Sequence, residues 1–154
     1  HIAYINISEK YNFANERKSS FLKNLKLNKI NFNPNYYASV KLEEPENSFE
    51  VIKKMLTKNK KISSIICSTE FSALSAIKAC NDLNYKIGKD ISIITFDGAL
   101  VRDLSSPPIT AVSFPVKELG KRAINILLDK NKNQTVNYLA KSEIIERGSV
   151  HIVS

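Results

Sequence analysis

Four polar side chains follow predicted strands at positions where a small molecule could bind. Arg17 lies in the segment after the first predicted strand, Thr69 and Glu70 follow the third, and Asp97 follows the fourth. In an open parallel sheet, ligands bind beyond the carboxyl ends of the strands, where helix N-termini offer backbone donors. A guanidinium, a hydroxyl and carboxylates suit a neutral polyhydroxylated ligand or a purine. The pattern therefore predicts a small-molecule site.

The same residues also have ordinary structural explanations. Arg17 could be a solvated helix residue, Thr69 an N-cap, and Asp97 a turn residue. General acid–base work by Glu70 and Asp97 is conceivable, but the sequence offers no third catalytic element. Spacing alone leaves the binding and structural interpretations open.

Several enzyme classes are excluded by the residues that their chemistry needs. The sequence has no GxSxG nucleophile motif and no Walker loop, and its four glycines form no GxGxxG cradle for a dinucleotide. A phosphoacceptor role for Asp97 would need an acidic pair after the first strand to hold Mg²⁺, where the chain has only Glu9. The sequence therefore favours binding over catalysis.

Metal and cofactor sites are not expected either. His1 and His151 lie near opposite ends of the sequence, with no Cys, Asp or Glu at ligand spacing. Cys67 and Cys80 flank a segment that is predicted to be helical, which places them on the order of 15 Å or more apart, too far for a disulfide. Two unpaired thiols fit a cytoplasmic location, and no apolar run approaches the roughly 20 residues that span a bilayer.

The charge of the chain is unusual, because the 154 residues carry a formal net charge of +8 and give a pI near 9.5. Nineteen of the 23 basic residues are lysines, whereas proteins that recognise guanine or bind phosphate do so mainly through arginine. Apart from short runs at 53–54 and 58–61, the lysines are spread along the sequence. We interpret the charge as a Lys-rich composition spread over the surface rather than as a nucleic-acid groove.

Short apolar runs alternate with amphipathic segments, which is typical of strands and helices around a parallel sheet. A helix capped by Asn12 is expected to reach about Leu27, and Ser68 or Thr69 is expected to cap a later helix. The fold class is therefore α/β, a three-layer parallel sheet with flanking helices. Strands are expected at 2–7, 36–40, 63–67, 91–96, 109–114, 135–140 and 142–146, and helices at 12–27, from 44, from 68 or 69, and at 115–128.

Five segments in order resemble the effector-binding region of the LacI/GalR transcription regulators. The strongest are the run from Gly88 to Asp97, similar to the family's G-x-D-I-S to G-F-D pattern, and the run from Pro107 to Val112, similar to P-P-L-T-T-V. The weaker ones are Glu16-Arg17 with Ser20-Phe21, the turn 67–70, and the ending 145–149. The resemblance covers nearly the whole chain.

The resemblance implies that Arg17 and Asp97 contact an effector, that Thr69 occupies a position where a ligand-contacting polar residue is common, and that Glu70 takes the acidic position of the turn. Ser20 and Thr95 stand where the family usually has glycine. No aromatic residue occurs near Leu42-Glu43, where members often stack one on the ligand, which leaves the ligand class open. Tyr36 or Tyr37 could substitute if the loop bends inward, although a core or surface role is favoured.

In such regulators the effector module resembles a periplasmic binding protein with two α/β lobes around a cleft. Residues 1–154 would form the second lobe, while the helix at 115–131 would belong to the first lobe. Most of that first lobe would be missing here, together with the DNA-binding helix-turn-helix. That helix should then lack its partner, so it would dock on another copy, swap, or be poorly ordered. The implied partners are a sugar-like or purine-like effector, a second copy in a homodimer, and operator DNA through the missing head. The alternative is a lobe of an extracytoplasmic sugar-binding transport protein.

Overall fold

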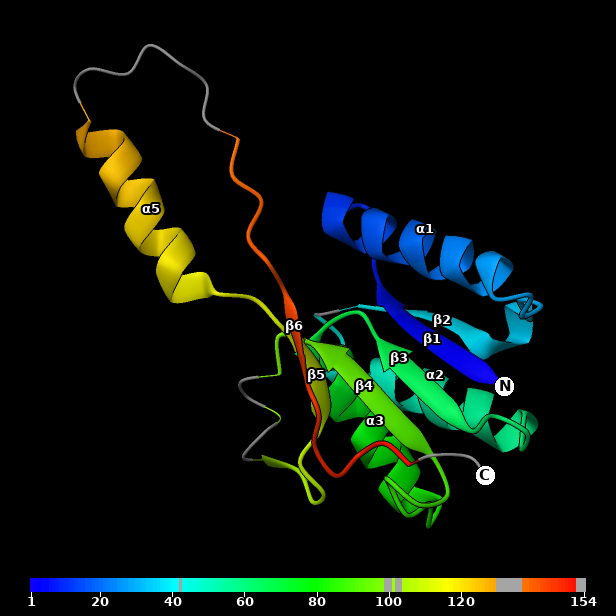
Figure 1. Cartoon of the computed structure of the whole chain (residues 1–154). Helices are drawn as coiled ribbons and strands as arrows, with labels where there is room; N and C mark the ends of the chain where they lie inside the picture. The colour runs from blue at the N-terminus through cyan, green and yellow to red at the C-terminus, as the bar shows by residue number, and fades with distance from the viewer. Residues whose placement is uncertain (42, 99–100, 102–103, 130–136, 152–154) are drawn as a thin grey trace.

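A six-stranded sheet forms the centre of the computed structural model, which describes residues 1–41, 43–98, 101, 104–129 and 137–151 (Figure 1). The strand order is β2-β1-β3-β4-β5-β6, and the first five strands are parallel. This arrangement confirms the predicted α/β fold with a mainly parallel sheet. The strands are β1 (Ile2–Ile7), β2 (Tyr37–Val40), β3 (Ser64–Cys67), β4 (Ser92–Phe96), β5 (Thr110–Ser113) and β6 (Glu143–Ile145).

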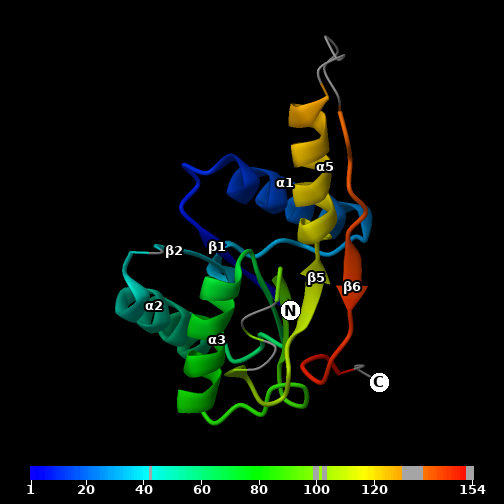
Figure 2. The same ribbon diagram turned by 90° about the vertical axis from the view of Figure 1, so that its left-hand side faces the viewer.

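Helices α2 (Pro45–Lys58) and α3 (Glu70–Asp82) cover one face of the sheet (Figure 2). Proline in the first turn of α2 needs no hydrogen-bond partner for its nitrogen, which favours a helix start there. Ile52 and Leu56 of α2 and Ala76 of α3 are fully buried in the main core, together with Ile65 and Ile93 of the central strands. The hydrophobic cluster on this face of the sheet is the larger of the two clusters.

Helix α1 (Asn12–Leu27) lies on the opposite face, so the sheet has helices on both sides as predicted. Phe21 and Leu25 of α1 pack with Tyr4 of β1, whose ring stacks on Phe21 with centroids 4.6 Å apart. Tyr11 is the N-cap and Asn12 is the first helical residue, so the expectation that Asn12 caps this helix is wrong.

The C-terminal part of the sheet differs from the prediction. Strand β6 pairs antiparallel with β5, with Val112 opposite Ile144. Residues 135–136 of the expected strand 135–140 lie outside the described residues, and 137–140 form no strand, so that strand is not confirmed. An antiparallel edge strand is a common end to a mostly parallel sheet.

Helix α5 (Val116–Leu128) stands away from the sheet in both views (Figures 1 and 2). Every residue of α5 is described, and none of them is buried. The exposed fraction of its apolar residues is 56% for Ile124 and 79% for Leu127. An amphipathic helix whose apolar stripe faces solvent lacks the surface that the stripe is built to cover. None of the helices in the described part of the chain has the length and apolar character of a bilayer span.

Candidate functional site

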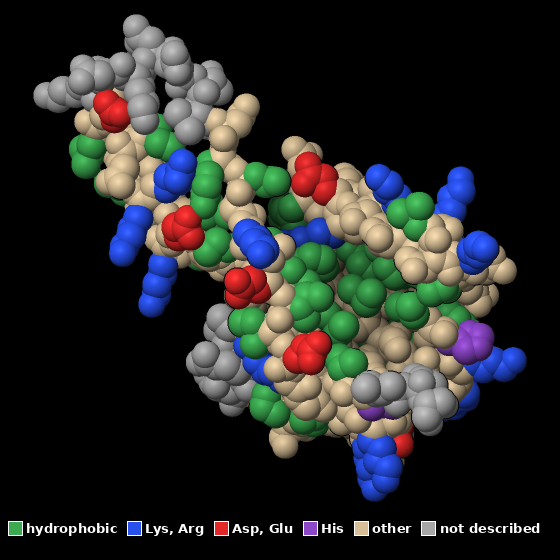
Figure 3. Space-filling model, viewed as in Figure 1, with side chains coloured by type: hydrophobic (Ala, Val, Ile, Leu, Met, Phe, Trp, Pro, Cys, Tyr) green, Lys and Arg blue, Asp and Glu red, His purple; other side chains and the backbone are tan. Residues whose placement is uncertain are grey.

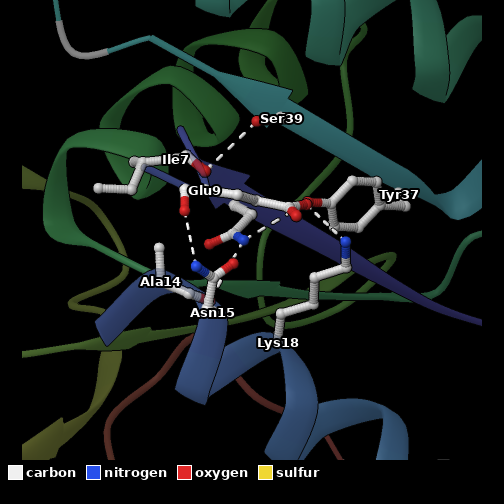
Figure 4. Close-up of polar contacts among 8 residues, drawn as sticks. Ile7, Glu9, Ala14, Asn15, Lys18, Tyr37 and Ser39 are labelled. Carbon is white, nitrogen blue, oxygen red and sulfur yellow. Dashed lines mark hydrogen bonds and ion pairs between the residues drawn. The ribbon is translucent and has the colours of Figure 1, made fainter. Parts of the chain in front are cut away.

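The turn between β1 and α1 is held by hydrogen bonds that converge on Glu9 (Figure 4). The Tyr37 hydroxyl donates to Glu9 Oε1 at 2.6 Å, and Lys18 Nζ lies 2.5 Å from the same oxygen. Asn15 Nδ2 donates to the Glu9 carbonyl at 2.6 Å. Hydrogen bonds from Lys18 and Tyr37 stabilise the carboxylate, so they lower the pKa of Glu9. The turn thereby fixes the first turns of α1, which carry Arg17.

Arg17 projects from α1 and is held by one carbonyl and three aromatic rings. Its Nη1 donates to the Ser68 carbonyl at 2.5 Å. Its Cζ lies 4.3 Å from the ring centre of Phe96, 5.0 Å from that of Phe13 and 5.7 Å from that of Phe114. Aromatic faces attract a cation, and a guanidinium carries five N–H donors. One bond to a carbonyl therefore leaves donors for a ligand.

Asp97 follows β4 and lies in a turn that only a few residue types tolerate. Its φ is 71° and that of Gly98 is 76°, in the left-handed region that Asp and Gly enter most readily. A Cβ on Gly98 would lie 2.2 Å from Ala111 Cβ, so the close approach to β5 also requires glycine. Asp97 is exposed, and its charge opposes the lowering of the Arg17 pKa by burial. The Arg17 guanidinium lies over the ring of Phe96, the residue before Asp97, so the guanidinium and the carboxylate lie at the same edge of the sheet.

Thr69 serves as the N-cap of α3, which confirms that part of the prediction. Its Oγ1 accepts a hydrogen bond from the Ser72 backbone nitrogen at 3.2 Å, and Ser72 Oγ accepts one from the Thr69 nitrogen at 3.2 Å. Glu70 is the first residue of α3 and is half-buried. The structural role of Thr69 is clear, whereas contact of Thr69 and Glu70 with a ligand stays a prediction.

The four predicted residues all lie at the carboxyl edge of the sheet. Arg17 is on the helix after β1, Thr69 and Glu70 follow β3, and Asp97 follows β4, and these three strands are adjacent and parallel. The bond from Arg17 to Ser68 links two of these turns directly. The geometry brings the guanidinium, the cap and the carboxylate to one edge, as the sequence predicted.

Three further residues at this edge have features that the sequence did not predict. Phe13 lies four residues before Arg17 on the same helical face and is 39% exposed, and this i, i+4 spacing could have identified it. Asn6 and Ser68 are fully buried near the carboxyl ends of β1 and β3, and among the described residues Asn6 Oδ1 and Ser68 Oγ have no hydrogen-bond partner. Buried polar groups without partners are costly, and no sequence pattern signals them.

The two tyrosines considered as substitutes for an aromatic ligand contact have other roles. Tyr36 is 8% exposed and belongs to the core, while Tyr37 bonds to Glu9 beneath the turn. The favoured core or surface interpretation is therefore confirmed for this pair. Leu42 lies outside the described residues.

The hollows of the surface only partly coincide with this edge. A hollow of about 400 Å³ is lined by Arg17 and Phe96 together with Tyr4 and Ile66, on the sheet face next to α1. Figure 3 shows hydrophobic side chains gathered on that face. A larger hollow of about 690 Å³ lies between α2 and α3, and its lining includes neither Arg17 nor Asp97. We place the candidate site at Arg17 and Asp97, because that edge carries the polar chemistry.

The described residues contain no group of three His, Cys, Asp or Glu side chains arranged to hold a metal ion. Cys67 and Cys80 are both free and both buried. Burial raises the pKa of Cys80 to about 12 and raises that of Cys67 as well, which makes both thiols poor nucleophiles.

Comparison with known proteins places this architecture in a family. The model of the periplasmic binding protein-like domain matches residues 1–150. The chain is 32% identical over 117 residues to the HTH-type transcriptional regulator RegA of Clostridium saccharobutylicum, covering 74% of this chain and 34% of that protein. It is 29% identical over 133 residues to the HTH-type transcriptional repressor PurR of Haemophilus influenzae, covering 85% and 39%.

Solved structures show the same fold. The Escherichia coli transcriptional repressor ascG superposes with a TM-score of 0.84 at 21% identity, over 98% of this chain and 55% of that one. The Lac repressor bound to ONPG gives a TM-score of 0.84 at 22% identity, over 97% and 45%. The chain spans about a third to two-fifths of the length of these curated relatives. It belongs to the periplasmic binding protein-like domain family, in the form found in LacI/GalR transcriptional regulators.

Proposed function

We propose that this chain is the second lobe of the effector-binding module of a cytoplasmic LacI/GalR-type transcriptional regulator. The observation that carries the proposal is the Arg17 guanidinium, held on aromatic rings beside Asp97 at the carboxyl edge of the sheet. This edge is where ligands bind in open α/β sheets. The proposal assigns the chain a binding role and no catalytic step.

The ligand that fits this edge is neutral, rich in hydroxyl or ring-nitrogen groups, and flat on one face. Arg17 donates and Asp97 accepts, so their opposite charges favour a ligand that offers both acceptors and donors. The exposed ring of Phe13 offers a surface for the apolar face of a sugar or a purine. Thr69 and Glu70 would complete the polar set from the start of α3. These features support a sugar-like or purine-like effector.

The regulatory step would be a shift between open and closed arrangements of two lobes. An effector that contacts both lobes favours the closed state by its differential affinity. We assign the segment 115–131, of which α5 (Val116–Leu128) is the helical part and residues 130–131 lie outside the described residues, to the first lobe, because the apolar stripe of α5 is exposed here. Operator DNA would be contacted by a helix-turn-helix that is not part of residues 1–154.

The alternative role, as a lobe of a sugar-binding transport protein, shares the same fold. The curated relatives described above are named as transcriptional regulators and repressors, which supports the regulator. The two roles predict different neighbours in the longer protein. A helix-turn-helix joined to the effector module supports the regulator, and a secretion signal supports the transport protein.

Mass spectrometry of ligands that co-purify with the native two-lobed protein would identify the effector, and calorimetry would then measure its affinity. We expect Arg17→Met and Asp97→Asn each to weaken binding by about 10-fold to 100-fold, because each removes a charged hydrogen bond. Arg122→Met, on α5, is the matched control and should bind normally. Unchanged affinity in both site variants would refute the assignment.

The chain of residues 1–154 alone should bind the same effector weakly. Half of the donors that close on the ligand belong to the other lobe, so their binding free energy is absent. We expect a Kd weaker than about 1 µM by calorimetry. Micromolar or tighter binding to this chain would show that one lobe holds the whole site.

We also propose that the lobe forms a homodimer through the hollow between α2 and α3. Phe49, Phe71 and Leu74 give it an apolar floor, with Glu50 on α2 and Lys78 on α3. A two-fold contact brings each acidic side against the basic side of the other copy. Light scattering should show a concentration-dependent dimer that Leu74→Glu abolishes. Leu127→Glu is the control on α5, and a monomeric wild-type chain would refute the proposal.

A further inference from the structure

Seven of the nineteen lysines of this chain lie at one edge of the sheet. The segments 28–36, 59–63 and 83–91 precede β2, β3 and β4, so the parallel topology brings them to the edge opposite Asp97. Helices α1 and α2 also end there. We call this surface the amino pole. Its exposed lysines are Lys26, Lys29, Lys58, Lys60, Lys61, Lys86 and Lys89.

These lysines have no carboxylate within ion-pair distance among the described residues. The two carboxylates of the amino pole are already engaged. Asp82 pairs with Lys53 at 2.8 Å, and Asp90 Oδ2 accepts a hydrogen bond from the Lys86 backbone nitrogen at 2.8 Å. The seven lysines of the amino pole therefore outnumber the carboxylates near them and leave an excess of positive charge there.

The opposite edge shows the reverse pattern. Its lysines are paired with carboxylates, at 3.5 Å for Lys10 with Glu43 and 2.6 Å for Lys41 with Glu44. The basic side chains along the right-hand and lower margins of Figure 3 have few acidic neighbours, whereas the acidic side chains lie mainly elsewhere. Seven of the nineteen lysines lie at the amino pole, and few carboxylates lie near them, so most of the net charge of +8 comes from this pole, while the other twelve lysines are spread over the rest of the chain.

Helix dipoles explain only a small part of this concentration. Lys26 and Lys58 lie in the last turns of α1 and α2, where a cation interacts favourably with the helix C-terminus. The other lysines of the amino pole lie beyond the helix ends in connecting segments, where the dipole falls off within one turn. Their concentration is not needed to stabilise the helices.

The segments of the amino pole are tied to one another. Asn59 Nδ2 donates to the Asn35 carbonyl at 3.3 Å and to the Met55 carbonyl at 2.9 Å. The Ser63 backbone nitrogen donates to the His1 carbonyl at 3.1 Å. The backbone of the segments 28–36 and 59–63 is therefore held together by hydrogen bonds, so these segments need no folding step to present their lysines together.

We propose that the amino pole binds the phosphate backbone of duplex DNA without regard to sequence. Lysine is a point charge that neutralises phosphate and releases counterions, and none of the arginines that read guanine lies in these segments. Protein interfaces are depleted in lysine, which makes an acidic protein a poorer match. The contact would hold a regulator near DNA, and operator specificity would still come from a separate reading head.

The test is fluorescence anisotropy of the 154-residue chain with a labelled random-sequence duplex at about 50 to 200 mM salt. The triple variant Lys58→Gln, Lys60→Gln, Lys61→Gln should weaken binding at least about 10-fold at the lowest salt and reduce the salt slope by about 0.9 per lysine. The control Lys117→Gln, Lys121→Gln, Lys141→Gln removes the same charge elsewhere and should weaken binding less than about threefold. Circular dichroism checks that each variant is folded.

Several results would overturn the proposal. Equal losses in the two triple variants would mean that net charge alone is responsible. If poly-glutamate displaced the labelled duplex from the protein as well as unlabelled duplex DNA does at the same concentration of negative charge, an acidic protein partner would be indicated. Binding to anionic phosphatidylserine vesicles without binding to DNA would indicate a membrane surface, for which the exposed Leu27, Ile30 and Phe32 would supply apolar contacts. Absence of DNA binding at about 50 mM salt would also refute it.

Discussion

Helices α3 and α5 have the same length of 13 residues and opposite environments. Seven residues of α3 are buried, and its start is closed by a reciprocal pair of cap hydrogen bonds. None of the residues of α5, all of which are described, is buried, and its N-cap residue Pro115 makes no side-chain cap bond. One helix is part of the lobe, and the other only extends from it.

The contrast shows that amphipathicity describes the surface a helix is built to cover, not the surface it covers in a given chain. Isolated helices of this length are marginal in water, and most of their stability in proteins comes from packing. Helix α5 therefore depends on a partner surface, whereas α3 has one. Replacements at matched positions measure this difference.

The largest effect is expected from removing a buried isoleucine. Ile77→Ala in α3, where the side chain is 8% exposed, should lower the free energy of unfolding by about 2 to 5 kcal/mol, because it removes buried contacts and leaves a cavity. Ile124→Ala in α5, where the side chain is 56% exposed, should change it by less than about 0.5 kcal/mol. Urea denaturation measures both. Equal effects would mean that α5 is packed in solution.

A smaller effect is expected at the start of α3. Thr69→Ala removes the acceptor for the Ser72 nitrogen and should cost about 1 kcal/mol, whereas Thr69→Ser keeps the acceptor and should cost little. Thermal unfolding of the three proteins measures the difference. If Thr69→Ser were as destabilising as Thr69→Ala, the lost methyl group rather than the cap would be responsible.

The smallest effect concerns α1, which has fewer buried residues than α3 and is anchored through Glu9. Folding lowers the pKa of Glu9, so its charged form stabilises the protein above the ordinary carboxyl range, and this contribution is lost as the pH falls. Glu9→Gln should therefore lower the Tm at pH 7 and change it less at about pH 3. Lys18→Gln, which removes the main partner, should show the same trend. A difference that is constant with pH would contradict this assignment.

A local cap made the start of α3 predictable, whereas at the start of α1 a different local hydrogen bond forms. Thr69 precedes a helix with Ser72 three residues later, which is sufficient for a cap. Asn12 is also a good capping residue, but Asn15 bonds to the Glu9 carbonyl and the helix begins one residue earlier than the cap would allow. A local preference is overridden where neighbouring segments supply other bonds.

The candidate site was predictable in its main parts because strand ends and turns are marked in the sequence. Arg17 and Asp97 could be assigned to one edge from the topology alone. Other features of the site depend on side-chain packing that no spacing rule describes. They are the position of the Phe13 ring beside Arg17, and the buried oxygens of Asn6 and Ser68 that have no hydrogen-bond partner among the described residues. The concentration of lysines at the amino pole likewise becomes visible only when separate segments meet.

The turn at Asp97 and Gly98 limits how the specificity of this lobe could be redesigned. A library at position 97 can sample Asn, which tolerates a positive φ and changes an acceptor into a group that also donates. A library at position 98 has no such freedom, because any side chain would collide with Ala111. New ligand preferences must therefore be sought at position 97 and at Phe13, with the backbone between β4 and β5 left unchanged.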